Sequence, residues 1–266
     1  MRSILALMRA AWLSALSYRL ATIISLVGLL ASVVPIYFIA NAVQGLASES
    51  IRLEGGNYFG FIILGIAATY VLASAVSAIP SALAGSIGSG TFESLLVTRT
   101  SLPVLLLGMS AYPLAQSLLR AALLVVGAAV IGVDVRWQMM PAALVILALM
   151  IVAYGAIGLI AASLVLVFRT SGPLITAVIA GSGLLGGVYY STAVIPGWLQ
   201  ALSGLVPLSY ALRAARMLLL GGASFADVGS DVAILALIAV TGLALSTIAF
   251  GIALRHARSA GTLSQY

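Results

Sequence analysis

Apolar runs of about 20 residues recur along the whole chain, and they limit its fold more than any other feature. Of the 266 residues, 63% are hydrophobic and only 7% are charged, whereas a soluble domain has about 25% charged residues. Inside a bilayer the backbone must satisfy its own hydrogen bonds, and apolar runs of this length do so as helices. The sequence therefore predicts an all-α membrane protein with a single transmembrane domain, residues 1–266.

Six spans joined by polar turns are expected. Their approximate ranges are 20–43, 58–83, 104–133, 141–168, 174–190 and 232–254. Before them, residues 1–19 carry three arginines among apolar side chains, which is typical of an interfacial helix on the membrane surface. A ragged start of the first span is the alternative.

The arginines predict the orientation of these spans. If both termini are cytoplasmic, seven of the twelve basic residues lie inside: Arg2, Arg9, Arg19, Arg99, Arg169, Arg255 and Arg258. Five of the six acidic residues then lie outside, among them Asp227 and Asp231, which we expect on a solvated external face. This asymmetry is the positive-inside pattern, and it favours cytoplasmic termini.

The segment 191–222 is too apolar for an ordinary loop, yet its prolines and its pair Arg213 and Arg216 make a poor crossing. A single crossing would also place the C-terminal arginines outside. A re-entrant hairpin of two short helices avoids both problems. Arg213 and Arg216 would share one face and extend to the outer headgroups. An amphipathic helix lying on the surface is the alternative.

Several chemistries are excluded because the residues they need are missing. The chain has no Lys, so it can hold neither a Walker A phosphate loop nor a Schiff base. It has no Cys, and its one His is His256, which disfavours thiolate metal sites, zinc proteases and Ser-His hydrolases. We expect no catalytic residue, metal or cofactor in this chain.

A polar break at residues 85–101 separates the second and third apolar runs. Ser89 or Thr91 can cap a helix start, and Glu93 then falls in the first turn, where a negative charge suits the helix dipole. Phe92, Leu95 and Leu96 follow at i, i+3 and i+4, which predicts a one-sided helix that a soluble partner could contact. A connecting loop with one helical turn is the alternative.

Two stretches resemble signatures of the ABC-2 type exporter permeases. GTFESLLVT, residues 90–98, resembles the G-T-x-E-x-L-L-V-T segment after the second span of that family. The family's signature near the fifth span is matched by Gly186-Gly187, Ile195-Pro196-Gly197-Trp198-Leu199, Pro207-Leu208-Ser209-Tyr210-Ala211 and Arg213 or Arg216. Order, spacing and six-span count agree over nearly the whole chain. One departure is Tyr189-Tyr190-Ser191, where the family often has F-F-P.

The resemblance implies the membrane subunit of an ATP-driven exporter in a bacterial plasma (inner) membrane. Two separate ABC ATPase subunits would hold ATP and Mg²⁺, and a second permease copy or a paralogue would complete a dimer. The cargo would be hydrophobic or amphipathic (a drug, as in multidrug efflux, a peptide or a lipid), moved by alternating access. The coupling helix on the ATPase would be formed by Gly90, Thr91, Phe92, Glu93, Leu95, Leu96 and Arg99. Membrane lipids are expected partners, and nucleic acid is not.

Three further groups of residues are candidates. Six aromatic residues gather at the expected outer ends of spans, as an interfacial belt or an outer gate over the pathway: Tyr37, Phe38, Tyr58, Phe59, Tyr189 and Tyr190. The hairpin candidates are Pro196, Trp198, Pro207, Tyr210, Arg213 and Arg216. Arg120 is the one ionisable residue well inside an expected span, and it lies near enough to the cytoplasmic side to favour a structural role. Gly183 and Gly187 would allow close helix packing, within the chain or across a dimer.

Other functions stay open at this point. A secondary transporter or channel is disfavoured because no Asp, Glu or His falls within an expected span to couple ions. An intramembrane enzyme is disfavoured by the missing His, Cys and Lys.

Overall fold

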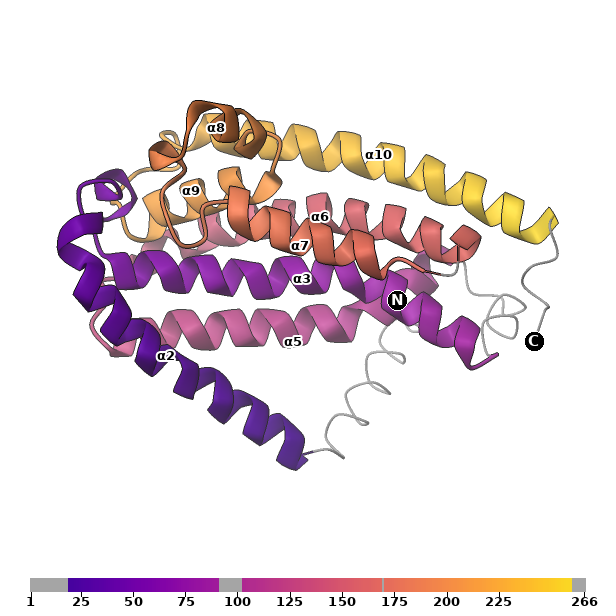
Figure 1. The fold of residues 1–266 in the computed structure, drawn as a ribbon, viewed down its shortest axis with the longest axis horizontal. Coiled ribbons are helices and arrows are strands. Elements are labelled where there is room, and N and C mark those ends of the chain that lie inside the picture. The colour runs from indigo at the N-terminus through magenta and orange to yellow at the C-terminus, as the bar shows by residue number, and fades with distance from the viewer. Residues whose placement is uncertain (1–18, 91–101, 169, 260–266) are drawn as a thin grey trace.

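The computed structural model describes residues 19–90, 102–168 and 170–259, and in these ranges it is helical throughout, with no strand (Figure 1). The long helices are α2 (Arg19–Ala47), α3 (Tyr58–Gly88), α5 (Leu102–Val130), α6 (Met140–Phe168) and α10 (Gly229–Ser259). The shorter ones are η1 (Arg52–Glu54), η2 (Trp137–Met139), α7 (Gly172–Leu185), η3 (Thr192–Val194), α8 (Gly197–Ser203) and α9 (Pro207–Leu219). The expected all-α fold is confirmed.

Five of these helices are long and apolar enough to cross a membrane: α2, α3, α5, α6 and α10. The exception is the span expected at 174–190, because α7 has only 14 residues. At 1.5 Å per residue it is about 21 Å long, shorter than the hydrocarbon core of about 30 Å. The helix ends early since Gly187 adopts a left-handed conformation with φ of 72°. The chain is thus a multi-pass membrane protein with five candidate spans and one shorter apolar helix.

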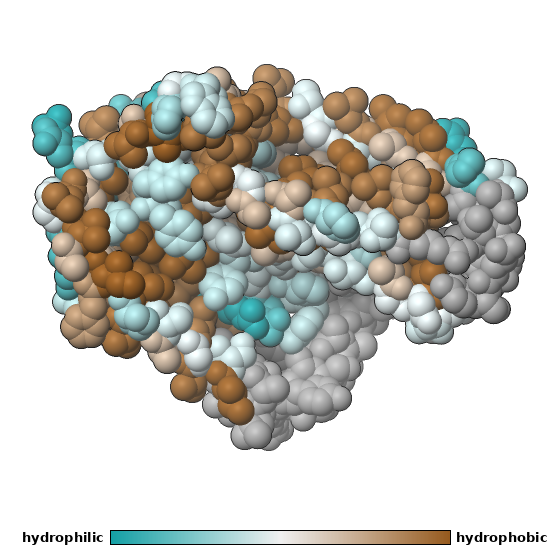
Figure 2. Space-filling view, viewed as in Figure 1, coloured by the Kyte–Doolittle hydropathy of each residue, from teal (hydrophilic) through white to brown (hydrophobic). Residues whose placement is uncertain are grey.

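The bundle is ordered around α3 and α6. α3 packs against α5 on one side and α6 on the other, and α6 also packs against α10. The side chains at the α3–α6 contact are fully buried, as Leu72, Val76, Met150 and Tyr154 show. α3 and α6 are apolar on all sides, which is typical of helices at the centre of a membrane bundle. Figure 2 shows that hydrophobic residues also cover much of the outer surface over α2, α7 and α10, as a lipid environment requires.

Apart from α7, which runs along the bundle, the short helices gather at one end, which we call the hairpin end (Figure 1). Here α2 ends, α3 and α10 begin, and the segment 191–222 folds into η3, α8 and α9 (Figure 1). Two short helices are therefore present where a hairpin was expected. Their depth in a bilayer stays a prediction.

Polar side chains close the turn between α2 and α3 at this end. Asn57 caps α3 by accepting a hydrogen bond from the backbone N–H of Gly60 at 2.8 Å. Gln44 donates to the carbonyl of Gly56 at 2.6 Å and accepts from the N–H of Tyr58 at 2.8 Å. These bonds pair backbone groups that the helix ends leave open, and so fix η1 beside the start of α3.

The closeness of α3 and α6 gives a stability test at two glycines of α6. A Cβ on Gly158 would lie 2.7 Å from the carbonyl oxygen of Val76 and 2.9 Å from that of Ala75. Backbone atoms of α3 cannot move away without displacing the helix. We therefore expect Gly158→Ala to lower the free energy of unfolding by about 1–3 kcal/mol and to lower the thermal midpoint of the purified chain in detergent.

Gly155→Ala is the matched control, because no atom lies within 4 Å of the Cβ it would add. It should be neutral, or stabilising by up to about 1 kcal/mol through helix propensity. The midpoints are measured by intrinsic fluorescence during heating. Equal midpoints for the two variants would contradict the α3–α6 packing.

Candidate functional site

The expected coupling helix falls mainly outside the described residues. Residues 91–101 are not described, so the roles of Thr91, Phe92, Glu93, Leu95, Leu96 and Arg99 stay predictions. Gly90 is the last described residue before this segment, with φ of 67°. The flanking helices do reach it: α3 continues to Gly88, and α5 begins at Leu102.

The most heavily bonded side chain at the hairpin end is that of Arg216 in α9, which is only 2% exposed. Its Nε and Nη2 both donate to the carbonyl of Phe61, at 3.1 and 2.8 Å. Its Nη1 donates to the carbonyl of Gly187 at 2.9 Å, and its Nη2 to that of Val188 at 3.0 Å. The fifth bond joins Nη1 to a carboxylate oxygen of Glu54 at 3.3 Å. A guanidinium has five N–H donors, and these contacts use all of them.

The expected position of Arg216 among outer headgroups is therefore wrong. The guanidinium carbon lies 3.4 Å from the centre of the Phe61 ring, and the surrounding carbonyls replace its water. Two of these carbonyls, those of Gly187 and Val188, are available because α7 has already ended at Leu185. The carbonyls left unpaired by the early end of α7 thus accept hydrogen bonds from the buried guanidinium of Arg216, which in turn needs these acceptors.

Gly65 of α3 leaves the room for this contact. A Cβ there would lie 2.5 Å from the carbonyl oxygen of Val188 and 2.9 Å from Nη2 of Arg216. Only the absence of a side chain lets the end of α7 and the guanidinium approach α3 this closely.

Glu54 is the acidic partner of Arg216, and it lies in η1 outside the membrane-spanning helices. Burial raises the pKa of Glu54, while the charge of Arg216 and its hydrogen bond act in the opposite direction. The pair is not a surface salt bridge, since both side chains are largely withdrawn from solvent. Each charge depends on the other for its compensation.

Arg213, one turn earlier in α9, is bound instead to α10. Its Nε lies 2.9 Å from Oδ2 of Asp231 and its Nη2 lies 2.5 Å from Oδ1, a bidentate pair. Asp231 is 7% exposed, so its expected place on a solvated face is wrong. Asp227 does lie on an exposed surface, where hydrogen bonds from the side chain and backbone of Ser224 lower its pKa. Arg213 thus connects α9 to α10, whereas Arg216 connects α9 to α3 and η1.

A cluster of hydroxyl groups joins the same helices from the inside. The fully buried Tyr154 of α6 donates to the hydroxyl of Ser182 in α7 at 2.9 Å. Tyr154 also accepts from the backbone N–H of Leu208 at the start of α9, at 3.3 Å. Ser203 donates to the carbonyl of Leu185 at 2.7 Å and lies 3.0 Å from the hydroxyl of Ser209. These bonds fix the end of α7 against α8 and α9.

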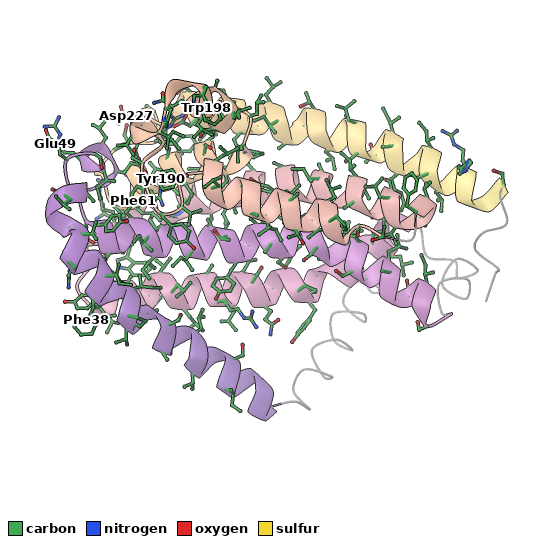
Figure 3. The ribbon with its side chains drawn as sticks, in the orientation of Figure 1. Phe38, Glu49, Phe61, Tyr190, Trp198 and Asp227 are labelled. Carbon is green, nitrogen blue, oxygen red and sulfur yellow. The ribbon has the colours of Figure 1, made fainter. Side chains whose placement is uncertain are left out.

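The six expected gate residues form two groups at the hairpin end, and Figure 3 labels one residue of each, Phe38 and Tyr190. Tyr37 of α2 packs edge-on against Phe59 of α3, with ring centres 5.3 Å apart. Tyr58 donates to the carbonyl of Tyr189 at 2.8 Å. Phe38 lies beside Tyr37 and is mostly exposed, and Tyr190 donates to the carbonyl of Leu184. Most of these side chains therefore join α2, α3 and the end of α7 to each other, and a role as a gate stays a prediction.

The remaining hairpin candidates have structural positions. Pro196 and Pro207 stand at the starts of α8 and α9, where proline fits a helix. Trp198 is exposed on α8, and Tyr210 donates to the carbonyl of Gly204 at 2.8 Å.

Three residues were singled out inside the expected spans, and only the two glycines have surroundings that differ from those expected. Arg120 of α5 donates to the hydroxyl of Ser25 in α2 at 3.0 Å, which agrees with a structural role. Gly183 has no atom within 4 Å of an added Cβ, whereas Gly187 lies beyond the end of α7 and meets Thr192. The expected helix face carrying both glycines is therefore absent, because α7 ends between them.

Comparison with known proteins agrees with this architecture. Residues 2–220 match the family described as ABC-2 type transporter. The chain belongs to the ABC-2 type transporter family. As a family member it is the permease, or membrane domain, of such a transporter, and the matched range includes α9 with both of its arginines.

This ABC-2 permease is similar to two proteins that are both called Nodulation protein J. The chain is 26% identical over 233 residues to Nodulation protein J of Rhizobium meliloti (strain 1021), covering 87% of each chain. It is 27% identical over 207 residues to Nodulation protein J of Rhizobium leguminosarum bv. trifolii, covering 77% of this chain and 78% of the relative.

Sequence reasoning found Arg213 and Arg216 but missed their partners in this permease. Glu54, Phe61, Gly65, Tyr154 and Asp231 lie far from α9 in the sequence, and nothing in their local pattern points to it. A usable signal was the presence of two arginines in an apolar segment, since buried cations need acids nearby.

Arg216→Lys tests whether the five-bond arrangement stabilises the permease. An ammonium keeps the charge but has three donors on one atom, so it cannot reach Phe61, Gly187, Val188 and Glu54 together. We expect a loss of about 3 kcal/mol or more, seen as a lower thermal midpoint in detergent.

Arg52→Lys is the matched control, because Arg52 is an exposed arginine at the same end of the molecule. Its midpoint should stay close to that of the parent. A tolerated Arg216→Lys would show that the buried guanidinium geometry does not matter for stability.

Proposed function

We propose that this chain is the membrane-spanning subunit of an ATP-driven exporter, which moves a hydrophobic or amphipathic compound out of the cytoplasm by alternating access. The observation that carries the proposal is the family match over residues 2–220. The similarity to Nodulation protein J along most of both chains supports it. Both termini are cytoplasmic in this proposal, and the hairpin end faces outside.

The energy source is a separate pair of ABC ATPase subunits. The chain cannot bind ATP through a phosphate loop of its own because it contains no Lys. In the proposal, residues 90–99 form the coupling helix that contacts the ATPase, with Phe92 as the apolar contact and Glu93 and Arg99 as polar ones.

α3 is the element that can transmit motion from this contact. It has 31 residues without interruption, about 46 Å at 1.5 Å per residue. Its C-terminal end leads into the proposed coupling segment, and near its other end the carbonyl of Phe61 accepts from Arg216. A tilt of α3 driven by ATP therefore moves α9 and the hairpin, which opens and closes the outer side.

The functional unit is a dimer, formed with a second copy or a paralogue. Apolar side chains on α2 and α7 are uncovered in the single chain, among them Val34, Ile39 and Leu184. The small residues of α7 leave space for a neighbouring helix, since nothing lies near Gly181 or Gly183. Contact through these faces would place the two permeases side by side, with the pathway between them.

Glu93→Arg and Phe92→Asp test the coupling. With the ATPase co-expressed and the complex reconstituted in liposomes, both variants should lose substrate-stimulated ATP hydrolysis and transport while keeping the parent's thermal midpoint. The physical reason is that each change removes a contact to the ATPase without altering the buried bundle.

Glu49→Arg is the control, an equal charge reversal at an exposed turn of the hairpin end, and it should keep both activities. Unchanged stimulated hydrolysis in Glu93→Arg would remove the coupling role. Directional transport by the purified chain alone, without any ATPase, would overturn the proposed function itself.

A further inference from the structure

An apolar cavity of about 480 Å³ lies at the hairpin end between α3, α5, α6 and α9. α5 and α6 each pack extensively against α3 and at most weakly against each other, and residues of both helices line the cavity. Small side chains keep it open, among them Ala68, Ala122 and Ala215. Its volume is in the range of sites that bind small organic molecules.

The cavity opens on the outer surface of the bundle. Val126 of α5 and Leu144 of α6 belong to its lining and are about half exposed. Both helices are candidate membrane spans, so the opening faces hydrocarbon when the chain is in a bilayer. We call this space the lateral groove. A molecule that enters it from the side is a hydrocarbon chain.

An indole, that of Trp137, lines the η2 end of the lateral groove, and the neighbouring cation Arg136 lies just outside the lining. Trp137 lines the groove and is half exposed. The preceding residue, Arg136, is held by its backbone N–H to the carbonyl of Leu219, which also lines the groove, at 2.9 Å. Its Nη1 donates to the carbonyl of Ala223 at 3.3 Å. Among the residues that the structure describes, Arg136 forms no ion pair, which leaves most of its donors for another acceptor.

We propose that the lateral groove binds one acyl chain of an anionic bilayer phospholipid, with the phosphate held by Arg136 and Trp137 at the level of the headgroups. Lipid tails are as apolar as the groove wall, so burial alone gives little preference for entering it. The selectivity comes from the charge of Arg136, and the chain is retained by contacts that an empty groove would lack. One arginine near a membrane surface gives about a fivefold preference for anionic lipid.

The lining favours this occupant over transported cargo. No side chain of the groove wall other than Trp137 carries a polar group, so the wall has no group that would orient the polar part of an amphipathic cargo. The lateral groove is therefore a lipid site that supports the packing of α9 against α3 and α6. This inference goes beyond the proposed function and does not depend on it.

Trp137 provides the probe. The chain has three tryptophans, and the substitutions Trp12→Phe and Trp198→Phe leave Trp137 as the single reporter. The full chain is reconstituted in vesicles of phosphatidylcholine and phosphatidylglycerol, with brominated acyl chains on one lipid or the other at constant composition. We expect brominated phosphatidylglycerol to quench Trp137 with about fivefold preference over brominated phosphatidylcholine.

Two pairs of variants separate a bound lipid from ordinary boundary lipid. Arg136→Gln should abolish the headgroup preference, whereas Arg52→Gln, at an exposed arginine outside the groove, should keep it. Ala122→Phe fills the groove and should reduce quenching, whereas Ala244→Phe, on the exposed face of α10, should not. Ala68→Phe fills the groove from α3 and replaces Ala122→Phe if that variant fails to fold.

Four results would overturn the proposal. Equal quenching by both lipids, or a preference that survives Arg136→Gln, would mean contact with boundary lipid only. Unchanged quenching in a groove-filling variant that loses transport in the complex would assign the groove to cargo. No quenching of Trp137 by either lipid would mean that protein, such as a second copy of the chain, covers the opening.

Discussion

The arrangement of the hairpin end depends on one buried guanidinium, that of Arg216, which forms five hydrogen bonds within the protein. Burying an unpaired cation in an apolar bundle is prohibitively costly, and burying one hydrogen-bonded to four residues is not. Arg216 meets this condition through backbone carbonyls of α3 and of the chain after α7, together with Glu54. The charge therefore fixes where α9, α3, η1 and the end of α7 lie relative to one another.

The same contacts explain why α7 is short. A helix that continued past Leu185 would use the carbonyls of its last turn internally, and Arg216 would lose two acceptors. Glycine makes the alternative possible at two points: Gly187 takes the left-handed turn, and Gly65 lets Val188 approach α3. Tyr154 and the serines near it then satisfy the groups left open at the end of α7. Among the described residues, the buried polar side-chain atoms at this end all have hydrogen-bond partners, as a low-dielectric environment demands.

α9 connects the parts of the permease that would have to move together. Arg216 joins it to α3, which leads to the proposed ATPase contact, and Arg213 joins it to α10 through Asp231. The lateral groove lies directly against the same helix. α9 therefore contacts α3, α10 and the lateral groove, and a displacement of α3 would act on all of these contacts. Lipid in the groove would stiffen α9 and the helices around it.

The sequence alone determined the helical class, the approximate limits of five long helices and the family, because length, hydropathy and short motifs are local properties that burial in lipid imposes on each segment separately. It also singled out Arg213, Arg216 and most aromatic residues of the hairpin end. Only the tertiary structure decided which acid each arginine meets, that α7 ends at Leu185, and that Asp231 is buried. Those outcomes depend on backbone groups and acids far away in the chain. The hydrophobic pattern of one segment cannot predict where carbonyls of a distant segment lie.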